Sequence, residues 1–144
     1  MSGLSRWLAL AALGGVVVVT TRCSSALMLE VLNASDRAVR IEASRQGEKR
    51  CDLPPGGKCV VEYALEMAIS SGPLRWEYQM PTPRFSNTDA DIFLERRGFY
   101  GPDVLPVRFE GTLQLRAARP GDGSGRVNPQ QPPGFPVHPS DTRE

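Results

Sequence analysis

The stretch Leu74-Arg-Trp-Glu-Tyr-Gln-Met80 decides the fold class of this chain, because four large apolar residues alternate in it with three polar ones. Successive side chains of a β-strand point to opposite faces, so an apolar residue at every second position predicts a strand with one buried face. Trp76 lies on the apolar face and is therefore expected in the core. The same alternation occurs at residues 38–43 and 112–116.

Less regular stretches rich in β-branched or aromatic residues extend this pattern along the middle of the chain. Clusters of glycine, proline, asparagine, aspartate and serine lie between them and indicate turns. The further predicted strands are residues 27–32, 59–65 and 104–109, and the predicted turns are residues 33–36, 54–57, 70–73 and 101–103. About six or seven short strands with such turns predict an all-β fold, either a small β-sandwich or a small barrel.

Residues 89–97 fit the strand pattern less well. Acidic residues begin the segment, two arginines end it and a glycine follows, and Thr88 and Asp91 have the spacing of a capping box. These signals predict one short helix, whereas Ile92-Phe-Leu94 suits a strand equally well. The sequence leaves both alternatives open for this segment.

Two short stretches, Val31-Leu-Asn-Ala-Ser35 and Asp52-Leu-Pro-Pro-Gly-Gly57, have a rhythm of strand and turn that resembles the early strands of an immunoglobulin-like sandwich. The inter-sheet Cys-Trp-Cys signature of a true immunoglobulin domain is absent from the sequence. The resemblance therefore implies a fold class and no function.

Composition divides the 144 residues into three segments. Residues 27–118 carry the strand pattern with enough apolar residues for one core, which predicts a single β-rich domain. Residues 119–144 hold six prolines and four glycines, which predicts a flexible tail in an extended polyproline II conformation. In the alternative, Phe135 and Val137 pin this tail against the domain as a strap.

Residues 1–26 predict export. Arg6 precedes fifteen uncharged residues, which as a helix would reach about 22 Å, less than the roughly 30 Å of a bilayer core. Small residues at positions 24–26 favour a signal peptide cleaved after Ala26. The alternatives are an uncleaved membrane anchor over residues 7–29 and a lipoprotein acylated on Cys23. All three place the domain outside the cytoplasm, in the periplasm or cell envelope, and the last two tether it to the membrane.

Cys51 and Cys59 are expected to form a disulfide. The Pro-Pro-Gly-Gly sequence between them reverses the chain, so the two cysteines are predicted to face each other across a hairpin. An oxidising compartment outside the cytoplasm favours this bond. The predictions of export and of a disulfide therefore support each other.

No group of residues indicates catalysis, a metal site or a cofactor. The only histidine, His138, lies in the proline-rich tail, which disfavours a catalytic triad and a zinc site. A net charge of +1 without clustered basic residues gives no support to nucleic-acid binding. The sequence therefore predicts a protein that is not an enzyme and binds no nucleic acid.

The motif Arg97-Gly-Phe-Tyr-Gly101 places Arg97, Phe99 and Tyr100 in a loop suited to contact with a protein partner. Fifteen arginines against two lysines suggest bacterial coding. We therefore expect an exported or membrane-tethered bacterial envelope protein that acts as a binding or structural β-module. The alternative is a carbohydrate-active or hydrolytic accessory domain that uses an Asp/Glu pair, with Trp76 or Tyr100 as a platform for a sugar ring.

Overall fold

The computed structural model describes residues 27–43, 49–85, 93–96, 101–116 and 125–144, and the predicted export segment lies outside these ranges. The regular structure of the described residues is all β, with no helix of more than one residue. In the same ranges no helix is long and apolar enough to cross a membrane. The strands are β1 (Met28–Asn33), β2 (Val39–Ala43), β3 (Lys49–Leu53), β4 (Lys58–Glu62), β5 (Glu66–Ser71), β6 (Leu74–Gln79), β7 (Glu95–Arg96), β8 (Asp103–Phe109), β9 (Leu113–Leu115) and β10 (Asp141–Arg143).

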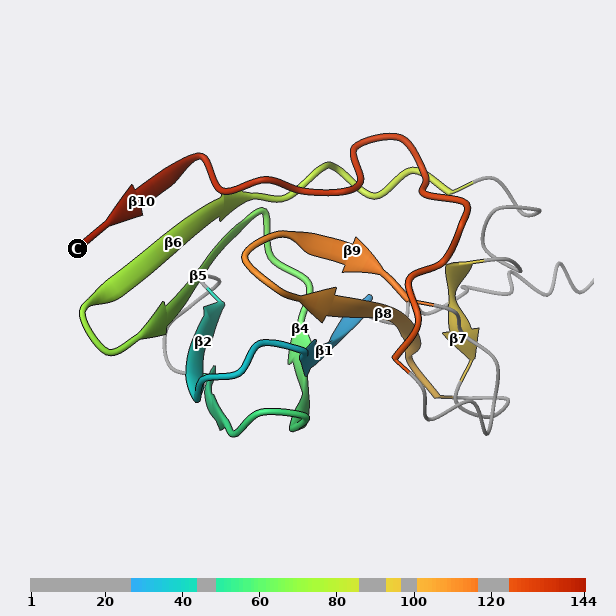
Figure 1. Cartoon of the computed structure of the whole chain (residues 1–144). Helices are drawn as coiled ribbons and strands as arrows, with labels where there is room; N and C mark the ends of the chain where they lie inside the picture. Colours follow the sequence, from blue (N-terminus) through green and yellow to red (C-terminus); the bar gives the residue numbers. More distant parts are fainter. Residues whose placement is uncertain (1–26, 44–48, 86–92, 97–100, 117–124) are drawn as a thin grey trace, which may run out of the picture.

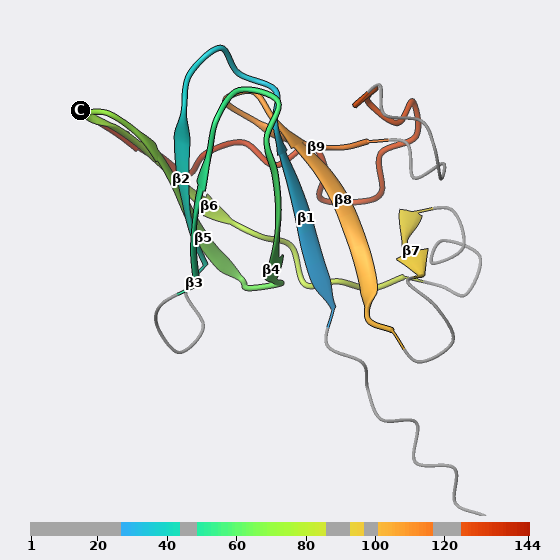
Figure 2. The same ribbon diagram turned by 90° about the horizontal axis from the view of Figure 1, so that it is seen from below.

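The strands form two sheets that pack against each other, so the predicted all-β fold is confirmed and the closed barrel is excluded (Figure 2). Sheet A has the order β4-β1-β8, and the short strands β7 and β9 pair with the beginning and the end of β8. Sheet B has the order β10-β6-β5-β2-β3. The pair β1 and β8 is parallel, and the other pairs of these strands are antiparallel.

The apolar faces of the two sheets meet in one hydrophobic core. Trp76 and Tyr78 of β6 extend inward from sheet B and contact the ring of Phe109, which comes from β8 in sheet A. The ring centroid of Phe109 lies 5.4 Å from that of Trp76 and 6.4 Å from that of Tyr78, both in edge-to-face geometry. The alternation in β6 thus has the predicted effect, because its apolar side chains fill the space between the sheets.

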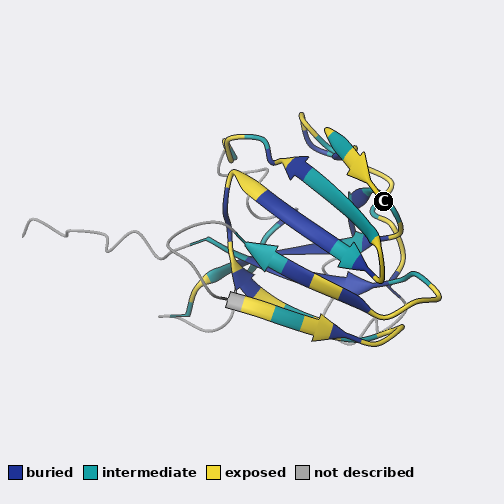
Figure 3. Ribbon diagram, turned by 90° about the vertical axis from the view of Figure 1, so that its left-hand side faces the viewer, coloured by how far each residue is buried: buried dark blue, intermediate teal, exposed yellow. Residues whose placement is uncertain are grey.

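The central strand β5 departs from the period-two pattern at its middle, where three successive residues are buried, whereas Glu66 at its start is exposed (Figure 3). Met67 and Ile69 enter the core, and Ala68 on the opposite face is 8% exposed. The turn predicted at residues 70–73 is shorter in the structure than in the prediction. β5 continues to Ser71, and only Gly72-Pro73 connect it to β6. The φ of Gly72 is +56°, and the fixed negative φ of proline after it is typical of a type II′ hairpin turn.

Residues 93–96 of the ambiguous segment 89–97 lie within the described residues, and of these Phe93 has helical backbone. There Glu95 and Arg96 form β7, which pairs with the beginning of β8. The predicted helix is therefore wrong for these two residues, because backbone pairing with sheet A outweighs the local helix signals. Residues 89–92 and Arg97 lie outside the described ranges.

Residues 125–144 lie along the domain, which differs from the predicted flexible tail. Val137 is 6% exposed, and its backbone exchanges two hydrogen bonds with Leu113, of 2.8 and 2.9 Å. The side-chain amide of Gln131 accepts a hydrogen bond from Leu115 N and donates one to Leu115 O, each of 3.0 Å. The backbone N–H and C=O groups on the outer edge of β9 need hydrogen-bond partners, and the C-terminal segment supplies these partners. Phe135 also packs against the core, as the strap alternative expects.

The same segment closes one flank of the sandwich (Figure 1). It runs beside β9 in sheet A and then pairs through β10 with β6 in sheet B, so it bridges the edges of both sheets. On the opposite flank, the turn Pro54-Pro-Gly-Gly57 carries the chain from β3 in sheet B to β4 in sheet A. Beyond β3 and β4 no further strand follows among the described residues, so these two edges are open.

Candidate binding surfaces

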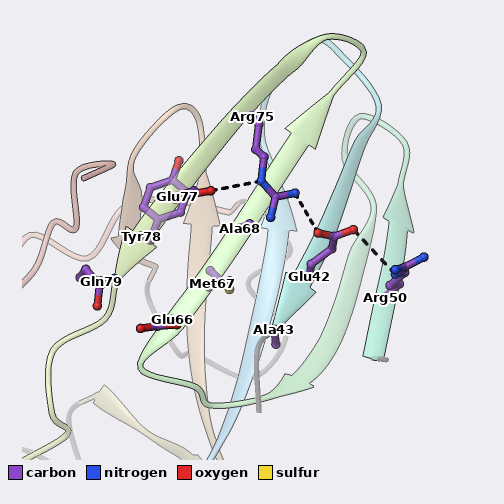
Figure 4. A pocket seen from close by; sticks show the side chains of 10 residues that line it. All are labelled: Glu42, Ala43, Arg50, Glu66, Met67, Ala68, Arg75, Glu77, Tyr78 and Gln79. Carbon is purple, nitrogen blue, oxygen red and sulfur yellow. Dashed lines mark hydrogen bonds and ion pairs between the residues drawn. The ribbon is translucent and has the colours of Figure 1, made fainter. Parts of the chain in front are cut away.

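The first surface that we consider is a hollow on the outer face of sheet B, which we call the charged hollow (Figure 4). Its volume is about 370 Å³. In the register of the sheet, Ala68 of β5 lies between Glu42 of β2 and Glu77 of β6, so a methyl group is flanked by two long side chains. The residues that line the charged hollow are Glu42, Ala43, Arg50, Glu66, Met67, Ala68, Arg75, Glu77, Tyr78 and Gln79.

Ion pairs connect the strands across the charged hollow. The small Ala68 leaves room for Arg75 of β6 to reach Glu42 of β2, where Arg75 Nη1 donates to Glu42 Oε2 at 2.9 Å. Arg75 Nε lies 3.4 Å from Glu77 Oε1, and Arg50 Nε lies 3.7 Å from Glu42 Oε1. The hydrogen bond from Arg75 lowers the pKa of Glu42 more than desolvation raises it, so this carboxylate is ionised at neutral pH.

The charged hollow has the properties of a solvated sheet face. An ionised Glu42 acts as a counter-ion and does not suit the role of proton donor in glycoside hydrolysis. The side chains of Arg75 and Glu42 are 41% and 31% exposed, and pairs in contact with water contribute only about 0–1 kcal/mol each. We therefore assign no ligand to this surface.

The second surface is a hollow of about 420 Å³ at one end of the sandwich, which we call the end hollow. Trp76 of sheet B and Phe109 of sheet A form its wall with Leu74 and Val39. Its other residues come from the β1–β2 loop, the end of β5 and the β8–β9 turn, and are Ala34, Ser35, Asp36, Arg37, Ser71, Glu110 and Gly111. Trp76 packs against the core as predicted but is only partly buried, so it also reaches this surface.

Hydrogen bonds from buried side chains hold the loops around the end hollow. Asn33 is fully buried, and its Oδ1 accepts from Ser35 N at 3.1 Å and Ser35 Oγ at 2.6 Å. Asn33 Nδ2 donates to the carbonyl oxygen of Arg37 at 2.7 Å. Tyr78 Oη donates to the carbonyl oxygen of Gly111 at 2.8 Å, and burial raises the pKa of Tyr78, so this donor keeps its proton. The end hollow is therefore preformed.

Charged side chains form the rim of the end hollow. Arg37 Nε lies 3.9 Å from Asp36 Oδ1, and Glu110 Oε2 accepts a hydrogen bond from Arg108 Nη2 at 2.5 Å. The side chains of Asp36 and Glu110 are 92% and 58% exposed, so both carboxylates are hydrated. An apolar wall with a few charged groups around it is the usual composition of a ligand site.

Cys51 and Cys59 lie next to each other, although not across a hairpin as predicted. Cys51 is on β3 in sheet B and Cys59 is on β4 in sheet A, because the turn between them transfers the chain from one sheet to the other. Both are half-buried and are free thiols in the structure. Burial and the adjacent Cys51 raise the pKa of the Cys59 thiol. The disulfide stays a prediction.

The remaining predicted site residues are not brought together by the described structure. Cys23, Arg97, Phe99 and Tyr100 lie outside the described ranges. His138 is exposed on the surface. Within the described ranges no three His, Cys, Asp or Glu side chains gather as ligands for a metal ion.

The buried polar groups of the fold were not predicted from the sequence. Glu30 and Arg116 form an ion pair whose side chains are only 11% and 7% exposed. Burial lowers the pKa of Arg116, which marks the desolvation that this pair must offset. An isolated charge within the apolar run of β1 is the signal that points to Glu30. Asn33 follows the same run, and from the sequence it was expected to be an ordinary turn residue rather than a buried one.

No protein-family model matches this sequence, and neither the curated proteins nor the solved structures contain a match to it.

Proposed function

We propose that this chain is a binding module of the bacterial cell envelope, exported or tethered through residues 1–26, and that the end hollow holds its ligand. The observation that carries the proposal is Trp76, an aromatic residue that is only partly buried in a preformed hollow of about 420 Å³. Loops at the end of a β-sandwich are a common place for ligand sites, because the sheets hold them rigidly. The export part of the proposal rests on the sequence of residues 1–26.

The end hollow suits a ligand with an apolar face and polar edges, such as a sugar ring. Trp76, which is only partly buried, offers apolar aromatic surface to the face of the ring, and the buried ring of Phe109 packs against Trp76 and supports it. Arg37 on the rim donates hydrogen bonds, and the carboxylates of Asp36 and Glu110 accept them from hydroxyl groups. Glycans of the cell envelope have this chemistry.

A hydrolytic function is the second candidate, and the position of Asp36 and Glu110 on the rim beside Trp76 is the observation that favours it. Glycoside hydrolysis needs one carboxyl group in an apolar environment that keeps it protonated near neutral pH. Asp36 and Glu110 are largely exposed, and Glu110 is bonded to Arg108. Binding without cleavage therefore has the better support.

We also propose that Cys51 and Cys59 form a disulfide in the envelope and so join the open edges of the two sheets. The position of both thiols between β3 and β4 supports this. The relation to immunoglobulin-like sandwiches is a proposal of the same kind, and the packing of two sheets supports it.

The test is a nuclear magnetic resonance titration of the full chain in mild detergent with soluble fragments of cell-wall glycan. We expect the indole signal of Trp76 to shift, and we expect Arg37→Ala to weaken binding at least about tenfold, the loss of one charged hydrogen-bond donor. Arg40→Ala is the matched control, because Arg40 is another exposed arginine and pairs with Asp52 on sheet B. An unchanged Trp76 signal contradicts the proposal, and shortened fragments would favour hydrolysis.

Export is tested separately by fractionation of cells that express the full chain. Recovery in the periplasmic or membrane fraction is the expected result. Recovery in the cytosol with Met1 to Arg6 intact would contradict the envelope location and leave the ligand titration unaffected.

A further inference from the structure

The open edge of β4 is the surface from which we draw a further inference. The C-terminal segment covers the flank of the sandwich formed by β9 and β6, whereas β4 ends sheet A: β3 lies near it in sheet B, but among the described residues no strand pairs with the outer edge of β4. Native proteins cover, bend or pair such edges, because unpaired N–H and C=O groups attract another strand.

The hydrogen bonds at the two ends of β4 show which of its backbone groups are free. Asn33 N donates to the carbonyl of Gly57 at 2.9 Å, and Tyr63 N donates to the carbonyl of Leu27 at 3.0 Å. In an antiparallel pair the bonded residues alternate, so 57, 59, 61 and 63 face β1. The N–H and C=O groups of Lys58, Val60 and Glu62 therefore point away from β1, into the open edge.

The side chains of these same three residues lie together on the outer face of sheet A, opposite the inward Cys59 and Val61. Val60 is 37% exposed and is one of the few large apolar residues on the described surface. Lys58 and Glu62 are exposed on either side of it, and neither forms an ion pair with any described residue.

This arrangement is self-complementary. When two copies of β4 meet antiparallel about a two-fold axis at Val60, Val60 faces the partner's Val60. Lys58 then faces the partner's Glu62, and Glu62 faces the partner's Lys58. Each facing pair is one that exchanges two backbone hydrogen bonds, so every free group of the edge finds a partner. Opposite charges that face each other across strands are stabilising, and like charges are destabilising.

We propose that this chain forms a symmetric dimer in which two β4 edges pair antiparallel about Val60 and extend sheet A across both subunits. The occupant of the edge is a second copy because the order of charge, apolar residue and opposite charge in β4 matches itself in that register. An isologous contact of this kind closes on itself and does not propagate into a fibre. The proposal is independent of the ligand proposed for the end hollow.

The test uses charge reversal in the full chain, with self-association measured by sedimentation equilibrium in density-matched mild detergent, up to about 0.5 mM because the interface is small. Lys58→Glu or Glu62→Lys places two like-charged pairs in the dimer, so each should raise the dimer dissociation constant at least about tenfold. The double variant Lys58→Glu/Glu62→Lys restores both pairs and should return to about the wild-type value. An equimolar mixture of the two single variants should form a heterodimer.

Two further variants complete the test. Val60→Pro removes a backbone donor that points only into the open edge, so the fold should persist while the dimer is lost. Glu66→Lys is the matched control, because it makes the same charge change at an exposed glutamate outside β4. A monomeric wild type, or a dimer that charge reversal leaves unchanged, overturns the proposal. The second result would assign self-association to residues 1–26 or another surface.

Discussion

Gln131→Leu should lower the free energy of unfolding by about 2 kcal/mol, because the Gln131 side chain takes the place of a strand beside β9. Leu115 N donates to Gln131 Oε1 at 3.0 Å, and Gln131 Nε2 donates to the carbonyl oxygens of Leu115 and Asn128 at 3.0 and 2.8 Å. Leucine has a similar volume and none of these polar groups.

The magnitude follows from the groups that lose their partners. The carbonyl of Leu115 still accepts a hydrogen bond from Asn128 N at 2.8 Å, and Asn128 is partly exposed, so water can reach its carbonyl. The main loss is the N–H of Leu115, a residue that is 1% exposed. An unpaired buried amide costs about 1–3 kcal/mol. For a domain of this size, about 2 kcal/mol lowers Tm by roughly 8–16 °C.

The assay is thermal unfolding followed by circular dichroism, with Gln130→Leu as the matched control. The side chain of Gln130 is exposed, and the hydrogen bond from its backbone N–H to Asn128 Oδ1 does not involve the side chain. Gln130→Leu should therefore change the free energy of unfolding by less than about 0.5 kcal/mol, and its Tm should stay close to that of the wild type. Equal Tm values for the two variants would refute the reasoning, because the hydrogen bonds of the Gln131 side chain would then add no stability.

Gln131→Glu adds a test of the hydrogen-bond direction. The ionised carboxylate can accept from Leu115 N but repels the carbonyl oxygens to which Gln131 Nε2 donates, so folding raises the pKa of the introduced carboxyl. A pKa raised by folding gives stability that is present below the unfolded pKa and is lost as pH rises through the folded pKa. This variant should therefore approach the wild type at acid pH and fall below it at neutral pH.

The remaining predictions concern the buried ion pair and the cysteines. Arg116→Ala removes the arginine that pairs with the buried Glu30 and should cost about 3–5 kcal/mol in chemical denaturation. Glu30→Met/Arg116→Met removes both charges and should be close to the wild type, and equal losses in the two variants would contradict this. Under denaturing, non-reducing alkylation, protein from the envelope should show no free thiol at Cys51 or Cys59, and labelling of both would disprove the disulfide. After reduction, Cys59 in the folded protein should react more slowly at pH 8 than in the unfolded protein, because folding raises its thiol pKa; equal rates would show that the thiol is not perturbed.

Features that depend on neighbours in the chain were predictable from the sequence. The alternation in Leu74–Gln79 gave the strand and its buried face, because the two-residue period of a strand is a local property. The turn at Pro54-Pro-Gly-Gly57 was predictable for the same reason, and the bond from Gly57 N to the carbonyl of Pro54 at 2.9 Å closes it. Trp76 was correctly expected to pack against the core.

Features that depend on which strands become neighbours were not predictable. The turn after β3 looked like a hairpin, but it connects two sheets, so Cys51 and Cys59 meet between sheet edges. β5 was missed because Ala68 on its outer face is buried between the long side chains of neighbouring strands, so three successive apolar residues, Met67 to Ile69, interrupt the alternation. The composition of residues 119–144 indicated a free tail, because nothing in the local sequence records that β9 offers an open edge.

The candidate surfaces also depend on which strands become neighbours. The end hollow combines Trp76 with residues more than thirty positions away, such as Phe109, and the register of two sheets brings them together. The open edge of β4 exists because the C-terminal segment pairs with β9 and β6 on the other flank. Local periodicity specifies a strand and its two faces, but the partner of each edge depends on the free energy of the whole assembly of strands.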